Sequence, residues 1–178
     1  DGDSEVAALL GQSHDRVRSM ALIHEMLYNS GDLARIDVGE YMEALLAEIA
    51  RAHAGLRLQV RTEIDHPPVD VEIGVPCGLI VTELVTNALK HGFAGRSEGV
   101  LSVSMRVAET GETELSVADD GAGWPADFDP ARAEGLGLSL VQILARQLAG
   151  SVQFSNTAGV TVTVRFPPPA IPETGVPS

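Results

Sequence analysis

The sequence has few aromatic residues, few cations and no long apolar run. Aromatic side chains make up 4% of the 178 residues, and 12 Lys and Arg stand against 25 Asp and Glu. The formal net charge of −13 argues against nucleic acid as the main partner, because phosphate backbones bind Lys/Arg patches. No stretch reaches the roughly 18 apolar residues of a membrane-spanning helix, and the acidic start DGDSEV is unlike a signal peptide. We therefore expect neither a nucleic-acid partner nor a membrane contact.

The single cysteine, Cys77, excludes an internal disulfide. It lies in an apolar stretch with helical periodicity and is expected to be a small core residue. A lone thiol fits a reducing compartment, so we expect a cytoplasmic location. The sequence does contain 44% apolar residues, which is typical of a globular protein with a real core.

Residues 5–28 are predicted to form one long helix. Apolar, Ser and His side chains recur at alternating spacings of four and three, at Val6, Leu10, Ser13, Val17, Met20, His24 and Leu27, and Leu9 and Ile23 widen this stripe. This spacing is typical of a helix-to-helix seam, so the stripe is expected to pack against a partner helix. Its polar members, Ser13 and His24, are expected to adjust the register or to lie at a wet edge. Arg16 and Arg18 lie off the stripe.

The rest of the chain predicts a second helix and then an alternation of strands and helices. After the connector NSGDLARID, Asp37 and Glu40 form a capping box for the second helix. The next long helix has Pro76 in its first turn and Gly92 just past its end. The expected strands and extended pieces span 56–64, 69–73, 101–107, 115–117, 152–154 and 160–166, and the later helices span 76–91 and 137–149.

A boundary is expected near residue 54, where helical periodicity gives way to strand periodicity. Residues 1–54 are predicted to form a helical segment. Residues 55–167 are predicted to form an α+β domain with helices on one face of a mostly antiparallel sheet. Residues 168–178 are proline-rich and are expected to be a disordered tail.

Polar side chains form one stripe on the otherwise apolar helix that contains ELVTNALKHG. At about 100° per residue, Glu83, Asn87 and Lys90 fall within about 60° of one another, and His91 lies beside them. An acid, an amide and a cation match the needs of a metal–phosphate complex, which are oxygen ligands for a hard cation and positive charge for phosphates. The alternative is a polar edge satisfied by neighbouring loops.

Two glycine-rich turns follow this helix. In VADDGAGWP, a strand leads into Asp119, Gly121 and Gly123; the glycines allow close backbone approach, and the carboxylate can accept a hydrogen bond from an amine such as that of adenine. In EGLGLSLVQILARQLAG, Gly135 and Gly137 precede a helix whose first N–H groups can bind phosphate. Each turn alone is weak support, because such sequences are also ordinary turn signals.

In this order, ELVTNALKH, DDGAG and GLGL resemble the N, G1 and G2 boxes of the GHKL ATPase/kinase superfamily. Within it, residues 55–167 resemble the ATP-binding domain of sensor histidine kinases. The stretch RVRSMALIHEMLYNSGDLARIDVGEYMEALL resembles the second dimerisation helix and linker of the HWE/HisKA_2 subgroup. The resemblance implies a Bergerat-type α/β sandwich preceded by a helical dimerisation segment.

The resemblance also implies a site for ATP with Mg²⁺. Asn87 would ligate Mg²⁺, with Glu83 orienting a water or the metal shell. Lys90 and His91 would contact the phosphates, and Asp119 would bind the adenine amine. The other implied binding positions are Gly121, Gly123, Gly135, Gly137 and Leu138, with residues 124–134 as a lid. Catalysis would consist mostly of positioning and of electrostatic stabilisation of the γ-phosphoryl group, with Glu83, Asn87 and Lys90 as catalytic residues.

The implied function is the catalytic core of a two-component histidine kinase. It would form a homodimer through its N-terminal helix and pass the γ-phosphoryl group to a histidine for relay to a response regulator receiver domain. Two alternatives stay open: a GHKL serine/threonine kinase of the anti-sigma-factor type, and a non-catalytic nucleotide-binding module.

The chain departs from the family pattern in two places. It reads Gly159-Val160-Thr161 where the family often has Gly-Thr before its last strand. The first dimerisation helix with its phosphoacceptor histidine is not evident either. His14 and His24 are expected to be surface or seam histidines, so this stretch of chain is not expected to phosphorylate itself.

Overall fold

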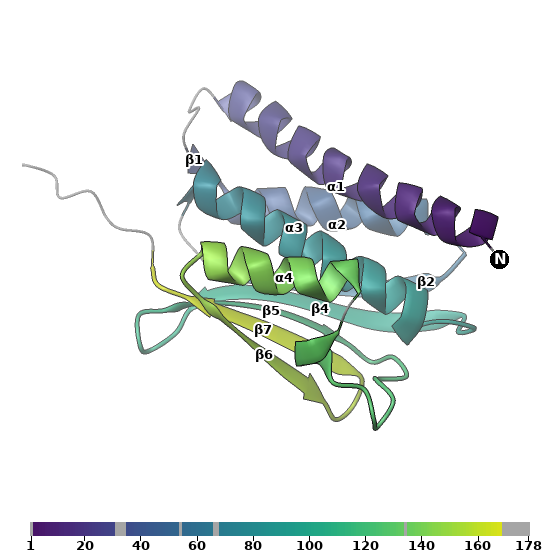
Figure 1. Cartoon of the computed structure of the whole chain (residues 1–178). Helices are drawn as coiled ribbons and strands as arrows, with labels where there is room; N and C mark the ends of the chain where they lie inside the picture. Colours follow the sequence, from purple (N-terminus) through teal and green to yellow (C-terminus); the bar gives the residue numbers. More distant parts are fainter. Residues whose placement is uncertain (1, 31–34, 54, 66–67, 134, 169–178) are drawn as a thin grey trace, which may run out of the picture.

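The computed structural model describes residues 2–30, 35–53, 55–65, 68–133 and 135–168. Three helices cover one face of a five-stranded sheet, and a long N-terminal helix lies on the outer side of two of them (Figure 1). The expected tail, 168–178, lies outside the described residues except for Pro168. The chain thus forms three layers: one outer helix, three inner helices and the sheet.

The helices and strands alternate along the chain much as the periodicity predicts. The helices are α1 (Gly2–Ser30), α2 (Val38–Ala52), α3 (Val71–Asn87), a π-helical turn (Ala88–Gly92), a short 3-10 helix (Pro130–Arg132) and α4 (Leu136–Gln147). The strands are β1 (Arg35–Ile36), β2 (Arg57–Asp65), β3 (Val69–Asp70), β4 (Glu98–Val107), β5 (Thr113–Asp119), β6 (Ser151–Asn156) and β7 (Val160–Phe166).

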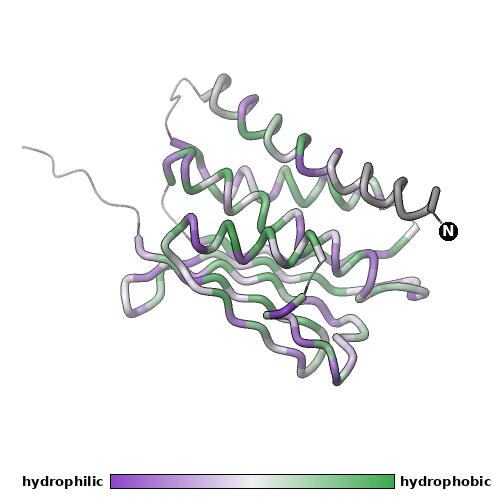
Figure 2. Tube along the Cα trace, viewed as in Figure 1, coloured by the Kyte–Doolittle hydropathy of each residue, from purple (hydrophilic) through white to green (hydrophobic). Residues whose placement is uncertain are grey.

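The five-stranded sheet has the order β2-β4-β5-β7-β6, with β2 parallel to β4 and the other neighbours antiparallel. Hydropathy alternates along its strands (Figure 2), so one face is apolar. Across that face, Val103 lies opposite Val117, Val117 opposite Val162, and Val162 opposite Phe154. The expected α+β class, with helices on one face of a mostly antiparallel sheet, is confirmed.

Helix α3 runs through the centre of the molecule and begins earlier than expected. The sequence predicts an extended piece over 69–73 and a helix from Pro76, whereas β3 ends at Asp70 and α3 begins at Val71. Pro76 lies inside the helix, in its second turn, and therefore removes one hydrogen bond that a regular α-helix would make there. The segment Val71–Gly92 is long and apolar enough to cross a membrane by composition, but 72% of its apolar window is buried in the core.

Close packing joins α3 to α2 at Gly78. The buried ring of Tyr41 occupies the space where a side chain on Gly78 would begin, so only glycine fits here. The Tyr41 hydroxyl lies 2.8 Å from the hydroxyl of Ser19 on α1, and burial raises the pKa of Tyr41 to about 12. Cys77, the neighbouring residue, is fully buried as expected, and burial raises its pKa to about 12.

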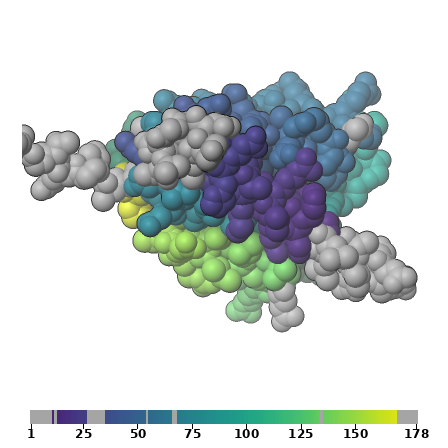
Figure 3. Space-filling model, turned by 90° about the horizontal axis from the view of Figure 1, so that it is seen from above, coloured from purple at the N-terminus to yellow at the C-terminus, as the bar shows by residue number. Residues whose placement is uncertain are grey.

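Helix α1 packs on the body through a face beside the predicted positions at spacings of four and three, and this face includes Ile23, which widens the stripe. The face against α2 and α3 carries Arg16, Ser19 and Ile23. The described residues at those spacings, Ser13, Val17, Met20 and His24, are exposed. Figure 3 shows α1 lying across the top of the helical layer. Ile23 belongs to the same hydrophobic core as α2 and α3, so the helices before residue 54 and the sheet domain share one core.

Candidate functional site

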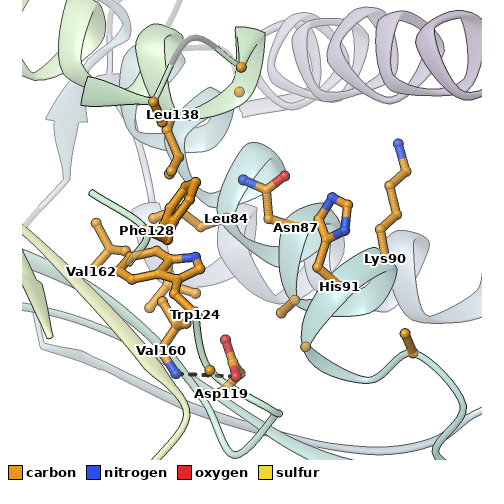
Figure 4. A pocket seen from close by; sticks show the side chains of 18 of the residues that line it. Leu84, Asn87, Lys90, His91, Asp119, Trp124, Phe128, Leu138, Val160 and Val162 are labelled. Carbon is orange, nitrogen blue, oxygen red and sulfur yellow. Dashed lines mark hydrogen bonds between the residues drawn. The ribbon is translucent and has the colours of Figure 1, made fainter. Parts of the chain in front are cut away.

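A pocket of about 600 Å³ lies beside the C-terminal end of α3, between the start of α4, the end of β5 and the start of β7 (Figure 4). Leu84, Val117, Leu138 and Val162 give it an apolar interior. Its polar groups come from three separate segments: the end of α3, the end of β5 and the start of α4. A pocket of this size with a few convergent polar groups is typical of small-molecule sites.

The polar stripe of α3 reaches the pocket at the π-helical turn. Asn87, Lys90 and His91 line the pocket; Figure 4 shows the Asn87 amide and the His91 ring together, with Lys90 extending beside His91. The turn closes through a 2.8 Å hydrogen bond from the Phe93 N–H to the Ala88 carbonyl, one residue longer than an α-helical bond. The predicted helix end at 91 is therefore a widened turn that displays an ammonium and an imidazole, next to the amide of Asn87 at the end of α3.

Asp119 and Asp120 are adjacent at the end of β5, but their carboxylates have different surroundings. Asp119 lines the pocket, and its Oδ1 accepts from the N–H groups of Gly121 at 2.8 Å and Val160 at 3.3 Å. Its Oδ2 has no hydrogen-bond partner within the described part of the chain, so that oxygen can accept from a ligand.

Asp120 is bound from outside the pocket. Its Oδ1 accepts from the Val100 N–H at 2.8 Å, and Arg96 donates to both its carboxylate and its carbonyl. The Val100 hydrogen bond is the main reason that the pKa of Asp120 lies below its usual value. Asp120 therefore holds residues 120–123, the glycine loop, against β4, whereas Asp119 lines the pocket.

An aromatic wall encloses the pocket on the side of the glycine loop. Gly123 has a φ of 72°, which favours glycine, and it turns the chain so that Trp124 and Phe128 line the pocket. Asn156 fixes this turn by accepting from the Trp124 N–H and donating to its carbonyl, both at 2.9 Å. The Trp124 ring lies 5.6 Å from that of Phe128 and 5.8 Å from that of Phe154, between centroids.

The start of α4 forms a further part of the pocket wall, where Leu138 lies beside Phe128 (Figure 4). Gly135 is its N-cap residue, and Gly135, Gly137 and Leu138 line the pocket. The first N–H groups of a helix have no partner within the helix, and this end of the helix dipole favours anions. Ser139 and Gln142 of α4 donate to carbonyls in residues 130–133, which holds the segment before α4 against the helix.

Glu83 lies one turn before Asn87 but does not line the pocket. Its side chain is fully buried and receives two hydrogen bonds from Arg16 of α1, from Nε to Oε1 at 2.5 Å and from Nη2 to Oε2 at 3.0 Å. The hydrogen bond to Glu83 raises the pKa of Arg16 above its usual value. This carboxylate therefore contacts the outer helix rather than the pocket.

Most of the predicted site residues meet in this one pocket. Asn87, Lys90, His91, Asp119, Gly123, Gly135, Gly137 and Leu138 all line it. Gly121 lies beside the pocket, bonded to Asp119, and Glu83 is turned toward α1. Sequence reasoning places Trp124 and Phe128 within the predicted lid, residues 124–134, but assigns neither a role of its own, and it misses Asn156. No local pattern in the sequence singles out Arg16.

The donors present fit a divalent cation that is shared with a ligand. Among the described residues, no three His, Cys, Asp or Glu side chains form a metal cluster. Asn87 offers an amide oxygen in the pocket, next to Lys90 and His91 of the π-helical turn. Mg²⁺ keeps few protein ligands and takes others from water and substrate phosphates. The residues therefore suit Mg²⁺ bound together with a polyphosphate.

Comparison with known protein families gives two matches that cover most of the chain. Residues 74–170 match the family described as "Histidine kinase-, DNA gyrase B-, and HSP90-like ATPase", which is more than half of the chain. Residues 1–53 match a family described as "Histidine kinase", HisKA_2.

Individual relatives are similar over nearly the whole length of this chain. "Blue-light-activated histidine kinase 2" of Erythrobacter litoralis is 28% identical over 169 residues, covering 90% of this chain and 48% of the relative. "Sensor histidine kinase PdtaS" of Mycobacterium tuberculosis is 28% identical over 173 residues, covering 93% of this chain and 34% of the relative. The chain thus spans half or less of the length of these curated relatives.

A solved structure has the same fold. The histidine kinase domain of the Erythrobacter litoralis EL346 blue-light activated histidine kinase superposes with a TM-score of 0.76 at 26% identity, covering 88% of this chain and 74% of that one. Matches to an anti-sigma F factor are partial: that of Priestia megaterium is 43% identical over 44 residues, 25% of this chain.

Proposed function

Because the chain belongs to the family of histidine kinase-, DNA gyrase B- and HSP90-like ATPases, we propose that it is the catalytic core of a sensor histidine kinase. It binds ATP with Mg²⁺ in the pocket beside α3. It transfers the γ-phosphoryl group to a histidine, from which the group passes to a response regulator receiver domain. Residues 1–54 serve as the dimerisation and linker segment, and residues 55–167 as the ATP-binding domain.

One observation carries this proposal: three segments far apart in the sequence meet in one pocket. Asp119 has a carboxylate oxygen available for the exocyclic amine of adenine, in an apolar setting where one hydrogen bond discriminates strongly. Trp124 and Phe128 offer faces for stacking of the base and exclude water from it. Lys90, His91 and the N-terminus of α4 bind the phosphates at the other end.

The metal would be held at the phosphate end. Asn87 would supply the protein ligand for Mg²⁺, which when bound neutralises charge on the transferring phosphoryl group. The residues of the chain orient the phosphates: Lys90 and the N–H groups that begin α4 offset the charge of the anionic oxygens, and the aromatic wall limits the access of water. Such preorganised groups stabilise charge without rearranging during transfer.

The exposed stripe of α1 is the proposed dimer contact. Val17 and Met20 are 66% and 42% exposed, which is unusual for apolar side chains aligned on one helix face. A helix from a second copy would cover them, and Val17→Glu together with Met20→Glu should then reduce the mass measured by light scattering to that of one chain. A cytoplasmic location is proposed with this function, and the buried free thiol of Cys77 is compatible with it.

Intact-mass analysis tests the proposed transfer. The chain is incubated with Mg-ATP alone and with an added acceptor helix from a related histidine kinase. Acid-labile phosphate on the added helix only, absent from Asn87→Ala, is the expected result. Acid-labile phosphate on the chain itself would assign an acceptor role to His14 or His24, both of which are exposed on α1.

The same assay separates the alternatives. Acid-stable phosphate on the chain or on a partner protein would indicate a serine/threonine kinase of the anti-sigma-factor type. That reading is not favoured, because the anti-sigma matches cover only a quarter or so of the chain. Binding of ATP without any transfer would indicate a nucleotide-binding regulatory module.

A further inference from the structure

Among the described side chains, the contact between Arg16 and Glu83 is the most buried ion pair between α1 and the rest of the molecule. The two residues are 67 positions apart in sequence and meet in a two-bond arrangement. Glu83 is fully buried, and the Arg16 side chain is 18% exposed. By contrast, Arg18 on the same helix pairs with Glu48 of α2 at the surface, where its side chain is 56% exposed.

A buried carboxylate must be paired, since an ion removed from water is costly without a partner. The planar guanidinium of Arg16 matches both oxygens of Glu83, which is the strongest geometry for such a pair. With α1 in this position, both oxygens are bonded to the outer helix. The same carboxylate lies one helical turn from Asn87, where side chains are roughly 5–6 Å apart at Cβ.

These two surroundings exclude each other. While it bonds Arg16, the Glu83 side chain does not line the pocket. To reach the magnesium–phosphate end beside Asn87, it would have to turn away from α1 and release the two bonds from Arg16. The next contact along α1, between Ser19 and Tyr41, is neutral and does not reach the pocket. Docking of α1 and occupancy of the pocket would therefore both act on the Glu83 carboxylate.

We propose that Arg16 is a positioning residue that holds the Glu83 carboxylate away from the pocket, so that docking of α1 and binding of Mg-ATP compete for this carboxylate. This inference rests on the proposed function, because it takes Mg-ATP as the ligand. Coupling between two sites is reciprocal. Whatever draws Glu83 toward the nucleotide loosens α1, and loosening α1 strengthens binding of the nucleotide.

Amide hydrogen exchange of the whole chain tests the first half of this reciprocity. Saturating Mg-ATP should speed exchange in residues 13–26 of α1 by about tenfold, within the usual range of coupling between sites. Adenosine, which brings neither metal nor phosphate, should leave it unchanged. In Glu83→Gln, whose amide can still accept from Arg16 but is a poor partner for a metal shell, Mg-ATP should also leave it unchanged.

Binding measured by the fluorescence of Trp124, the single Trp of the chain, tests the second half. Arg16→Gln should raise the affinity for Mg-ATP about tenfold and leave that for adenosine unchanged. Arg16→Lys keeps the charge but loses the two-bond geometry, so it should lie between. Arg18→Gln is the matched control, since it removes a neighbouring arginine that pairs with α2, and both affinities should stay at the wild-type value.

The outcomes separate this inference from the proposed function. If Arg16→Gln changes both affinities equally, or lowers that for Mg-ATP, Arg16 is only structural and the inference fails. The inference also fails if amide exchange in α1 is unchanged when Mg-ATP is bound. A chain that binds no ATP at all overturns the proposed function as well. If Arg16→Gln does not fold, as judged by circular dichroism, Arg16→Lys and Glu83→Gln decide the question.

Discussion

Helix α3 and the π-helical turn that follows it form one continuous element, but its first and second halves have different roles. Residues 71–82 are packed so closely that glycines stand where Ile36 and Tyr41 approach. Residues 83–92 keep one apolar face but present Glu83, Asn87, Lys90 and His91, and they end in a widened turn. One continuous helix thus joins a rigid support to a reactive site, and substitutions in the two halves should differ in what they change.

Gly78→Ala should have the largest effect, and it should fall on stability. The added methyl group would overlap the buried ring of Tyr41, and moving that ring would break its contact with Ser19. The strain exceeds the gain in helix propensity of roughly 1 kcal/mol, leaving a loss of about 2–3 kcal/mol. Urea unfolding would measure it.

Gly74→Ala is the control for that substitution. Its added methyl would meet the flexible end of Ile36, which can rotate away, so the loss should be under about 1 kcal/mol. Equal losses at Gly74 and Gly78 would show that the Tyr41 contact does not determine the packing of the first half.

Asn87→Ala should have the next largest effect, and it should fall on binding. Removal of the amide should weaken binding of ATP with Mg²⁺ by about 2–3 kcal/mol, roughly a hundredfold. Binding of adenosine and the free energy of unfolding should change little. Titration followed by Trp124 fluorescence measures both ligands, and equal losses for ATP and adenosine would refute the metal role of Asn87.

Lys90→Ala should have a smaller effect of the same kind. The side chain lies beside His91 (Figure 4) and is half-buried, so water screens part of its charge. We expect a loss of about 1 kcal/mol for ATP, which shrinks in about 0.5 M salt, roughly three times physiological ionic strength. Lys90→Arg should restore most of it. A loss that does not depend on salt would contradict a role based on charge.

Thr86→Val should have the smallest effect and the opposite sign. The Thr86 hydroxyl is buried and has no hydrogen-bond partner within the described residues. Replacement by a methyl group removes an unsatisfied polar atom and should stabilise the protein by about 1 kcal/mol. Thr82→Val, which loses a 2.8 Å bond to the Gly78 carbonyl, is the matched control and should not stabilise. A loss of stability in Thr86→Val would show that this hydroxyl does have a partner, such as a bound water.

The sequence predicts the second half of α3 better than the first. Asn87, Lys90, His91 and Asp119 are visible because a polar stripe on an apolar helix and an acid before glycines are local patterns. The sequence predicts the start of α3 five residues too late, because proline is typical of a first helical position and rare inside a helix. Local propensity does not separate the two when tertiary packing lengthens the helix.

The contacts that depend on distant segments could not be predicted. Arg16 and Glu83 are 67 residues apart, and nothing in either local pattern indicates the other. The apolar stripe of α1 was visible, but periodicity does not tell which face of a helix meets its own domain when both faces carry apolar residues. Here Ile23 and Ser19 are buried while Val17 and Met20 are exposed. The parallel pairing of β2 with β4 is likewise a property of topology rather than of either strand.

The π-helical turn at Ala88–Gly92 has a consequence for chain length. It contains one residue more than an α-helical turn needs, so deleting one residue would let the helix close regularly. The same deletion would rotate every later residue by about 100°. It would also withdraw the Gly92 carbonyl from the Ala122 N–H, which it meets at 2.9 Å in the loop that follows Asp119. Insertions and deletions at this turn should therefore be tolerated less well than substitutions. The extra residue determines how the end of the helix is oriented relative to the glycine loop.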